Sequence, residues 1–248
     1  MTDRYCVGLL STVDEPLLPF YLVAILSQKI ENIVVICDSK KMTSEKDKKI
    51  WEERTGGAFE KDVNGKSTIY QMEEARIPFY FVRNHNDDKT LRLISSLSVN
   101  VLLNAGTPRK LSPKILDSVV HGCINIHPGL LPFYRGCSAV EWALFNDDKI
   151  GNTAHFMTEG YDEGNIIASE WYEFPKDINY QSIRTRVYRD GMVLAARVLR
   201  KVIDKKMLPT DGIPQDPHAA KYWNPIPDEK FKLALKKVSD QKYKYQRL

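Results

Sequence analysis

An amide and an imidazole lie two residues apart, at Asn125 and His127, within the apolar segment 123–128, Cys-Ile-Asn-Ile-His-Pro. Side chains two residues apart in a strand share one face, and Pro128 disfavours helical geometry at His127. We therefore expect both at the carboxyl end of a strand, where open α/β sheets bind ligands. An imidazole transfers protons near neutral pH and an amide N–H can donate to an oxyanion. The pair suits attack on a carbonyl; a strand end that only satisfies backbone groups is the alternative.

A carboxylate, Asp162, lies in the segment 158–164, Thr-Glu-Gly-Tyr-Asp-Glu-Gly. Its glycines permit a tight loop, in which a carboxylate can orient the imidazole or a water molecule; an ordinary hairpin turn is the alternative. The Gly- and Pro-containing loop 129–136 runs into a helix that we expect to begin at Ser138. Such a loop can receive an anion at a helix N-terminus or be a plain connection.

The elements that position these residues follow from the apolar pattern. Apolar strands alternate with helical segments, which predicts an α/β fold, a Rossmann-like, mostly parallel sheet with helices on both faces. Ser138 followed by Glu141 is the signature of a capping box. Strands are expected over 4–10, 32–38, 78–82, 100–104, 122–127, 152–157 and 165–173. Helices are expected over 20–30, within 39–68, and over 67–76, 87–98, 138–146, 179–206 and 231–238.

Length and composition narrow the class of protein. The chain has 248 residues, a net charge of +4, 43% hydrophobic and 27% charged residues, which is typical of a globular protein. We expect a domain over 1–207, and over 208–248 a C-terminal extension or small subdomain, because its first half is rich in proline. No apolar run approaches the roughly 20 residues of a membrane span, and no secretory signal is apparent. Four scattered cysteines favour a reducing cytoplasm.

The sequence lacks the motifs that would indicate several other kinds of chemistry. The five histidines show no metal-ligand spacing, so no metal site is expected. No G-x-G-x-x-G run follows the first predicted strand, where the residues are Gly8-Leu-Leu-Ser-Thr12. This weakens a dinucleotide-binding interpretation. The small net charge does not by itself indicate a nucleic-acid partner.

Four motifs in order resemble the 10-formyltetrahydrofolate-dependent formyltransferase family, which includes the sugar N-formyltransferases. They are Gly106-Thr-Pro-Arg-Lys-Leu-Ser-Pro113, Asn125-x-His-Pro128, Leu130-Leu-Pro132 with Gly136, and Asp162-x-Gly164. The resemblance is strong from about residue 101 to 170 and weaker over the preceding sheet. One departure is Gly129, where the family usually has Ser.

The resemblance implies formyl transfer from 10-formyltetrahydrofolate to an amine, without a covalent enzyme intermediate or a metal. The catalytic residues would be Asn125 and a protonated His127, which stabilise the tetrahedral oxyanion, and Asp162, which holds His127 and helps relay a proton. Residues matching the cofactor-binding positions are Pro108, Arg109, Lys110, Leu111, Gly160 and Tyr161.

We infer the acceptor of the formyl group by excluding the acceptors that two other groups of the family use. Glycinamide ribonucleotide transformylases carry a Gly- and Ser-rich phosphate loop after the first strand, whereas Asp14 and Glu15 stand in this loop and would repel a phosphate. Methionyl-tRNA formyltransferases add a C-terminal β domain, and the roughly 40 residues after the long helix are expected to be too few for one. The expected acceptor is the amino group of a nucleotide-linked amino sugar for polysaccharide biosynthesis. Its expected binding residues are Ser11, Thr12, Phe79, Tyr222 and Trp223.

Several alternatives stay open at this point. The protein could formylate methionyl-tRNA or glycinamide ribonucleotide, hydrolyse formyl-folate, or bind folate without catalysis. The segment 221–225, Lys-Tyr-Trp-Asn-Pro, could stack a nucleobase or pack on the core. Sugar formyltransferases are often dimers, so a homodimer is also an expectation, whereas membrane and nucleic-acid partners are not expected.

Overall fold

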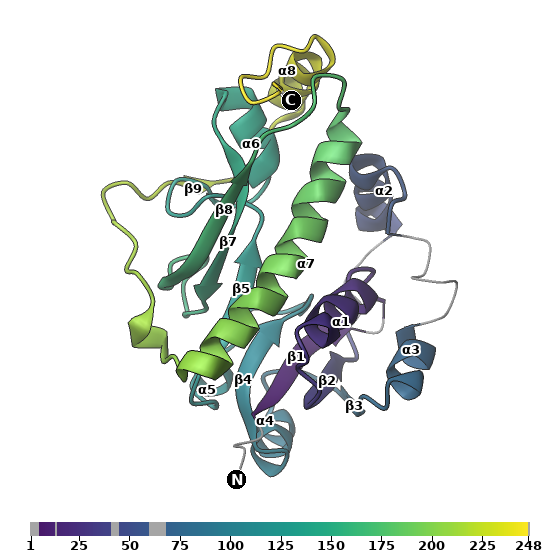
Figure 1. Ribbon diagram of the computed structural model, residues 1–248, viewed down its shortest axis with the longest axis vertical. Helices are drawn as coiled ribbons and strands as arrows, with labels where there is room; N and C mark the ends of the chain where they lie inside the picture. Colours follow the sequence, from purple (N-terminus) through teal and green to yellow (C-terminus); the bar gives the residue numbers. More distant parts are fainter. Residues whose placement is uncertain (1–4, 13, 41–44, 60–67, 248) are drawn as a thin grey trace.

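A mostly parallel sheet organises the protein (Figure 1). The computed structural model describes all residues except 1–4, 13, 41–44, 60–67 and 248. The main sheet has the strand order β3-β2-β1-β4-β5-β7-β8. The first five of these strands are parallel neighbours, and β7 pairs antiparallel with β5 and β8. The strands are β1 (Cys6–Thr12), β2 (Ile33–Asp38), β3 (Phe79–Val82), β4 (Val99–Asn104), β5 (Cys123–His127), β7 (Ile150–Phe156) and β8 (Ile166–Tyr172). The expected α/β Rossmann-like fold is confirmed.

Helices cover both faces of this sheet. Alternate β1 side chains explain this: Val7 and Leu9 pack into the core beneath α1 and α7, whereas Leu10 packs into the core beneath α4 and α5. The described helices are α1 (Leu18–Ser27), α2 (Glu45–Thr55), α3 (Thr68–Glu74), α4 (Asp88–Ser96), α5 (Pro113–Leu116), α6 (Ala139–Asn146), α7 (Tyr180–Lys205) and α8 (Asp228–Ser239), with a 3₁₀ turn, η2 (Pro209–Asp211).

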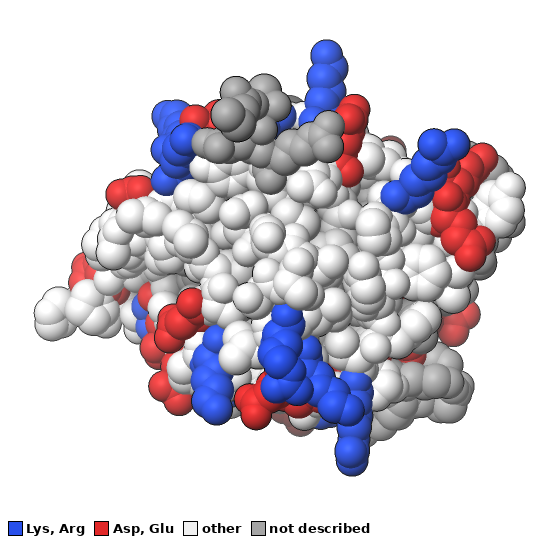
Figure 2. Space-filling view, turned by 90° about the horizontal axis from the view of Figure 1, so that it is seen from below, with Lys and Arg blue, Asp and Glu red and all other residues white. Residues whose placement is uncertain are grey.

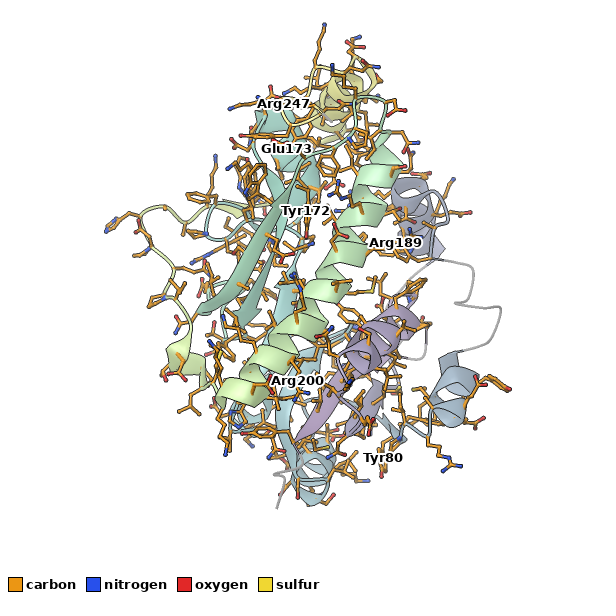
Figure 3. The ribbon with its side chains drawn as sticks, viewed as in Figure 1. Tyr80, Tyr172, Glu173, Arg189, Arg200 and Arg247 are labelled. Carbon is orange, nitrogen blue, oxygen red and sulfur yellow. The ribbon has the colours of Figure 1, made fainter. Side chains whose placement is uncertain are left out.

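The longest helix, α7, crosses the sheet diagonally in Figure 1 and is amphipathic. Its apolar stripe, which includes Val187, Leu194 and Val198, is buried. Arg189 and Arg200 lie along the same helix in Figure 3, and Arg200 forms an ion pair of 3.0 Å with Asp204 one turn later. The helix therefore closes one face of the sheet with its apolar side.

Some local details differ from the sequence expectations. They depend on contacts between distant residues, or they concern elements too short to leave a pattern in the sequence. The capping box at Ser138 and Glu141 is wrong, because Ser138 has a left-handed φ of 52° and its side chain makes no capping hydrogen bond. Glu141 instead accepts from the hydroxyl of Tyr180 at 2.5 Å and pairs with Arg184. The pattern also missed α5 and two short strands, β6 (Arg135–Gly136) and β9 (Tyr222–Trp223). Parts of the predicted region 39–68 lie outside the described residues.

The C-terminal residues 208–247 share a core with the rest of the chain. Strand β9 pairs in parallel with β6. Ala234 and Val238 of α8, together with Tyr243, are buried against α6, β7, β8 and the start of α7. Figure 1 shows this segment as a strap that includes β9 and ends with α8 beside α6.

The strand order has a switch point between β1 and β4. From β1 the chain moves outward to β2 and β3, and later returns to add β4 and β5 on the other side. In open α/β sheets, ligands bind at such a switch point, outside the carboxyl ends of the strands. At this end of the sheet, β1, β4 and β5 end at Thr12, Asn104 and His127.

The surface agrees with the small net charge. Seen from below in Figure 2, Lys and Arg side chains are interspersed with Asp and Glu around the rim, and the middle of this face is uncharged. Among the described helices, none combines the length and apolar character that a membrane span requires.

Candidate active site

Asn125 and His127 lie at the carboxyl end of β5, two residues apart as the sequence predicts. The antiparallel register places Asn125 opposite His155 and His127 opposite Thr153 of β7. Because cross-strand neighbours share a face of the sheet, His155 joins the amide and the imidazole on the same side.

The ring of His127 is buried, with 5% of its surface exposed. Its Nε2 lies 2.5 Å from the carbonyl oxygen of Tyr134. A carbonyl only accepts, so Nε2 carries a hydrogen, and in the neutral ring Nδ1 is the free base. Nδ1 lies 3.4 Å from Oδ1 of Asp162. Burial lowers the pKa of His127, although the carboxylate of Asp162 and the Tyr134 carbonyl oppose this.

Gly129 explains how the Tyr134 carbonyl reaches His127. A Cβ at position 129 would lie 2.8 Å from Nε2 of His127 and 2.9 Å from the Tyr134 carbonyl oxygen. A side chain at this position would therefore crowd both partners of the hydrogen bond. The departure from the Ser of the resembling family is consistent with this local packing.

Asp162 turns back toward β5 through a left-handed backbone conformation, with a φ of 57°. Asp tolerates this conformation better than most residues. Its Oδ2 accepts a hydrogen bond of 2.8 Å from the Gly136 N–H, and its Oδ1 lies 3.6 Å from Nε2 of His155. Burial raises the pKa of Asp162, but contacts with His155, His127 and the Gly136 N–H outweigh burial and lower it to about 2. The carboxylate is thus ionised at neutral pH.

Two further polar residues complete this cluster. Nδ2 of Asn104 donates to Oδ1 of Asn125 at 2.9 Å, and Nδ2 of Asn125 lies 3.1 Å from Nε2 of His155. The sequence interpretation missed both residues. Asn104 ends a predicted strand, as Asn125 nearly does, which was a usable signal. The role of His155 depends on the antiparallel pairing of β5 with β7, which the pattern does not reveal.

A cavity of about 290 Å³ opens beside these side chains. It is lined by two chain segments, 107–111 and 157–162, and by the side chains of Asn104, Asn125 and His155. All the predicted cofactor-binding positions are among its walls: Pro108, Arg109, Lys110, Leu111, Gly160 and Tyr161. Of the predicted catalytic residues, Asn125 and Asp162 line the cavity and His127 is buried beside Asp162.

The guanidinium of Arg109 is committed to a neighbour. Its Nε and Nη2 donate to the two carboxylate oxygens of Asp38 at 2.6 and 3.1 Å. Asp38 is buried at the end of β2 and also accepts from the His85 backbone N–H at 2.9 Å. This tie anchors the segment 107–111 to the end of β2.

Three of the predicted substrate-binding residues lie at the end of β1 or next to the catalytic loop, and the other two lie apart from the cavity. Ser11 and Thr12 are buried at the end of β1, where the Ser11 hydroxyl donates to the Ala105 carbonyl at 2.6 Å. Tyr222 is 54% exposed, and its ring would contact a Cβ added to Gly136 at 2.9 Å, so it lies next to the catalytic loop.

Phe79 and Trp223 lie apart from the cavity. Phe79 begins β3 and therefore lies at the amino end of that strand, away from the carboxyl ends where the cavity opens. The centroid of its ring lies 5.7 Å from that of Phe81. The ring of Trp223 stacks on Tyr134 at 5.6 Å and contacts Trp142 at 4.5 Å. Its indole N–H donates to the Phe133 carbonyl.

Gln215, in the strap after η2, links the two loops of the site. Its Nε2 donates to the carbonyls of Asp162 at 2.9 Å and Gly164 at 2.8 Å. Its Oε1 accepts two hydrogen bonds from Arg135, at 3.0 and 2.9 Å. The side chain thereby fixes the loop that carries Asp162 relative to the loop that carries Gly136. Within the described part of the chain, no group of three or more acidic, His or Cys side chains is arranged to hold a metal ion.

The fold and this cluster agree with one family. Residues 22–199 match the family model described as formyl transferase. This match spans more than half of the chain, and the protein belongs to the formyl transferase family. A methionyl-tRNA formyltransferase from Clostridium tetani is 27% identical over 125 residues, 50% of this chain and 40% of that protein. The match therefore spans less than half the length of that curated relative.

Solved structures share the fold. Glycinamide ribonucleotide transformylase 1 from Symbiobacterium toebii has a TM-score of 0.60 at 20% identity, covering 84% of this chain and 92% of that chain. An N-formyltransferase from Helicobacter canadensis, solved with folinic acid and dTDP-3-aminofucose, has a TM-score of 0.58 at 14% identity, covering 88% and 70%. These relatives differ in the acceptors that their names imply, so the fold does not select among acceptors.

Proposed function

We propose that this protein is an N-formyltransferase that moves a formyl group from 10-formyltetrahydrofolate to the amino group of a nucleotide-linked amino sugar. The observation that carries the proposal is the cavity wall formed by Asn125, His155 and Asp162, with His127 buried beside Asp162. Family membership supports formyl transfer, and the wall supplies groups that this chemistry requires.

The reaction would use the cluster as follows. The amine nitrogen attacks the formyl carbon, a new C–N bond forms and the carbonyl oxygen becomes an oxyanion. Asn125 has a second amide hydrogen beyond the one directed at His155, and it can donate this hydrogen to the oxyanion. The tetrahedral species then collapses, the bond from carbon to N10 of the folate breaks, and a proton passes from the amine to N10.

The proton transfer would depend on His127 and Asp162. Neutral His127 exposes Nδ1 as a base toward Asp162, and the ionised carboxylate stabilises the imidazolium once a proton arrives. That His127 is protonated when it stabilises the oxyanion stays a prediction; burial lowers the pKa of His127, and the Asp162 carboxylate opposes this.

The formyl donor would occupy the cavity of about 290 Å³. The walls suit a flat heterocycle, since Leu111 and Met157 supply apolar surface and the backbone of 107–111 supplies hydrogen-bonding groups. Tyr161 is 56% exposed and lies at the cavity, where its ring can contact an aromatic part of the donor.

The acceptor assignment rests on the loop that follows β1. Glu15 is buried there, with its carboxyl packed directly against Gly106, and Asp14 adds a second carboxylate. Asp14 disfavours a phosphate at this position, as glycinamide ribonucleotide would require. Burial raises the pKa of Glu15 to about 7, so at neutral pH this carboxyl adds only part of a negative charge. An amino sugar presents its amine away from its phosphates, so both groups can be accommodated separately.

A coupled assay tests the proposal. The protein is supplied with 10-formyltetrahydrofolate and a panel of nucleotide-linked amino sugars, with methionyl-tRNA and glycinamide ribonucleotide as further acceptors, and release of tetrahydrofolate is followed. Turnover with one amino sugar is expected. Turnover only with methionyl-tRNA or glycinamide ribonucleotide would contradict the acceptor, and release without an acceptor would indicate a hydrolase. Folate binding without release would indicate a binding protein.

A further inference from the structure

We propose that Asn104 is a positioning residue that fixes the orientation of the Asn125 amide and, through it, the tautomer of His155. The catalytic part of this inference rests on the proposed formyl transfer, whereas the hydrogen-bonding part does not. Asn104 ends β4, Asn125 lies on β5 and His155 on β7, so the chain of contacts crosses three neighbouring strands at the carboxyl edge.

The chain starts from backbone groups that can only donate. Oδ1 of Asn104 accepts hydrogen bonds from the N–H groups of Gly106 at 3.2 Å and Thr107 at 2.9 Å. Backbone N–H groups have no acceptor role, so the oxygen of the Asn104 amide must face them. The orientation of Asn104 is therefore determined by the loop that follows β4.

The second link follows from the first. With its oxygen held by the loop, Asn104 presents Nδ2 to Asn125, and the atom of Asn125 at 2.9 Å must be the acceptor Oδ1. The Nδ2 group of Asn125 is then directed toward His155 and the cavity. A reversed Asn125 amide would place its NH₂ group against the NH₂ group of Asn104, so Asn104 prevents this orientation.

The third link fixes His155. Its Nε2 faces the donor Nδ2 of Asn125 at 3.1 Å, and its Nδ1 lies 3.0 Å from the Phe156 carbonyl oxygen. A carbonyl requires a donor, so the neutral ring carries its hydrogen on Nδ1 and accepts at Nε2. Oδ1 of Asp162 also faces Nε2, but at 3.6 Å it is farther away than the Asn125 amide. The nearest partner at each ring nitrogen therefore demands the same tautomer, and the demand at Nε2 comes from Asn104 through Asn125.

This arrangement has a functional consequence. An oxyanion in the cavity needs an N–H donor, and only one orientation of the Asn125 amide presents its nitrogen there. Without Asn104, the amide could rotate and place its oxygen toward the developing negative charge. Asn104 thus fixes the amide before substrate arrives, which is the form of preorganisation that electrostatic stabilisation requires.

The substitution Asn104→Asp separates this role from loop support. A carboxylate still accepts from the Gly106 and Thr107 N–H groups but cannot donate to Asn125, so the Asn125 amide reverses and Nε2 of His155 must take a hydrogen. The matched control is Asn86→Asp. Asn86 holds the far end of the same loop, accepting from Ser112 N–H at 2.8 Å and donating to the Lys110 carbonyl at 2.9 Å.

The first readout is independent of activity. In ¹⁵N NMR of the histidine rings, with the His155 signals assigned from a His155→Gln variant, wild-type protein is expected to be protonated at Nδ1 only. Asn104→Asp is expected to protonate Nε2, and Asn86→Asp to leave the wild-type pattern. Protonation of wild-type His155 at Nε2 would overturn the proposal even if Asn104→Asp does not fold, and an unchanged pattern in the folded variant would overturn it as well.

The second readout uses the reaction. Asn104→Asp is expected to lower kcat by about 10²-fold, as loss of an oriented oxyanion donor does, with KM for the formyl donor changed less than about threefold. Asn86→Asp is expected to keep kcat. An unchanged kcat in Asn104→Asp would refute the positioning role. Wild-type protein that transfers no formyl group would contradict only the proposed function, because the NMR result stands separately.

Discussion

Nδ1 of His127 and Oδ1 of Asp162 lie 3.4 Å apart in a buried pair that joins the end of β5 to the loop between β7 and β8. The two residues are far apart in sequence, and the Gly136 N–H and Gln215 hold the loop that carries Asp162. The pair can therefore receive a proton without a change in backbone position.

Asp162→Asn should lower turnover by about 10²–10³-fold, because an amide cannot stabilise the imidazolium of His127. Steady-state kinetics measures this loss. Glu163→Gln is the matched control, since Glu163 is the next residue, is half exposed and forms a long ion pair of 3.8 Å with Arg135. Equal turnover in Asp162→Asn and wild type would remove Asp162 from the mechanism.

Asp162 should also contribute to acid stability. Its pKa is about 2 in the folded protein against a reference of 3.8, so its stabilising effect is present above about pH 4 and disappears as the pH falls toward 2. Urea unfolding at several pH values should show a weaker acid-induced loss of stability in Asp162→Asn. The same loss in variant and wild type would contradict the depressed pKa.

His155→Ala should reduce turnover by about tenfold or more, because the Asn125 amide loses one of its two fixed partners. His121→Ala is the control for loss of a buried imidazole. Its ring contacts Tyr5 and the Met207 carbonyl, remote from the cavity. It should lower the melting temperature and keep the turnover per folded molecule. Loss of activity in both variants alike would assign the effect to stability.

Gln215→Ala should lower turnover by about tenfold, because four hydrogen bonds that hold the Asp162 and Arg135 loops together are lost. Gln181→Ala, at an exposed position on α7, is the control. Kinetics with folate and acceptor varied separately should show the change mainly in kcat. Full activity of Gln215→Ala would show that the strap does not position Asp162.

Glu15→Gln should stabilise the protein at alkaline pH. Burial raises the pKa of Glu15 from 4.5 to about 7, partly offset by the Leu17 N–H. The folded protein therefore keeps the proton longer than the unfolded chain, and wild-type stability falls as the pH rises from about 4.5 to 7. The variant should avoid up to about 3 kcal/mol of this loss.

Urea unfolding at pH 5 and pH 9 measures this difference. Glu31→Gln, which changes an exposed carboxylate, is the control and should show no such dependence on pH. A gain of Glu15→Gln over wild type that is the same at both pH values would contradict a raised pKa.

The predictable part of the fold comes from local patterns. The continuous apolar strands and the stripe on α7 reveal the sheet and its main helices, since burial requires those periodicities. Asn125 and His127 are predictable as a pair because one residue separates them on a strand. The loop 158–164 is predictable from its glycines: a Cβ at Gly164 would collide with the Phe156 carbonyl.

The remaining part depends on contacts between distant segments. His155 reaches Asn125 only through the register of β5 with β7, and Gln215 reaches Asp162 only because the strap returns to the site. The stacking of the Trp223 ring with Tyr134 and Trp142 also joins distant segments, and a contact of Trp223 with the acceptor stays a prediction. Phe79 begins β3 and so lies at the amino end of that strand, and its contact with the acceptor likewise stays a prediction.

Transfer of a labelled formyl group tests the central claim most directly. The protein is incubated with 10-[¹³C]formyltetrahydrofolate and the amino sugar found active, and the ¹³C label is followed by NMR. We predict that the label appears in a formamide on the sugar, and that Asn125→Ala and His127→Ala each slow its appearance by about 10²–10³-fold while remaining folded. Label found in free formate, or transfer at the wild-type rate in either variant, would contradict the account.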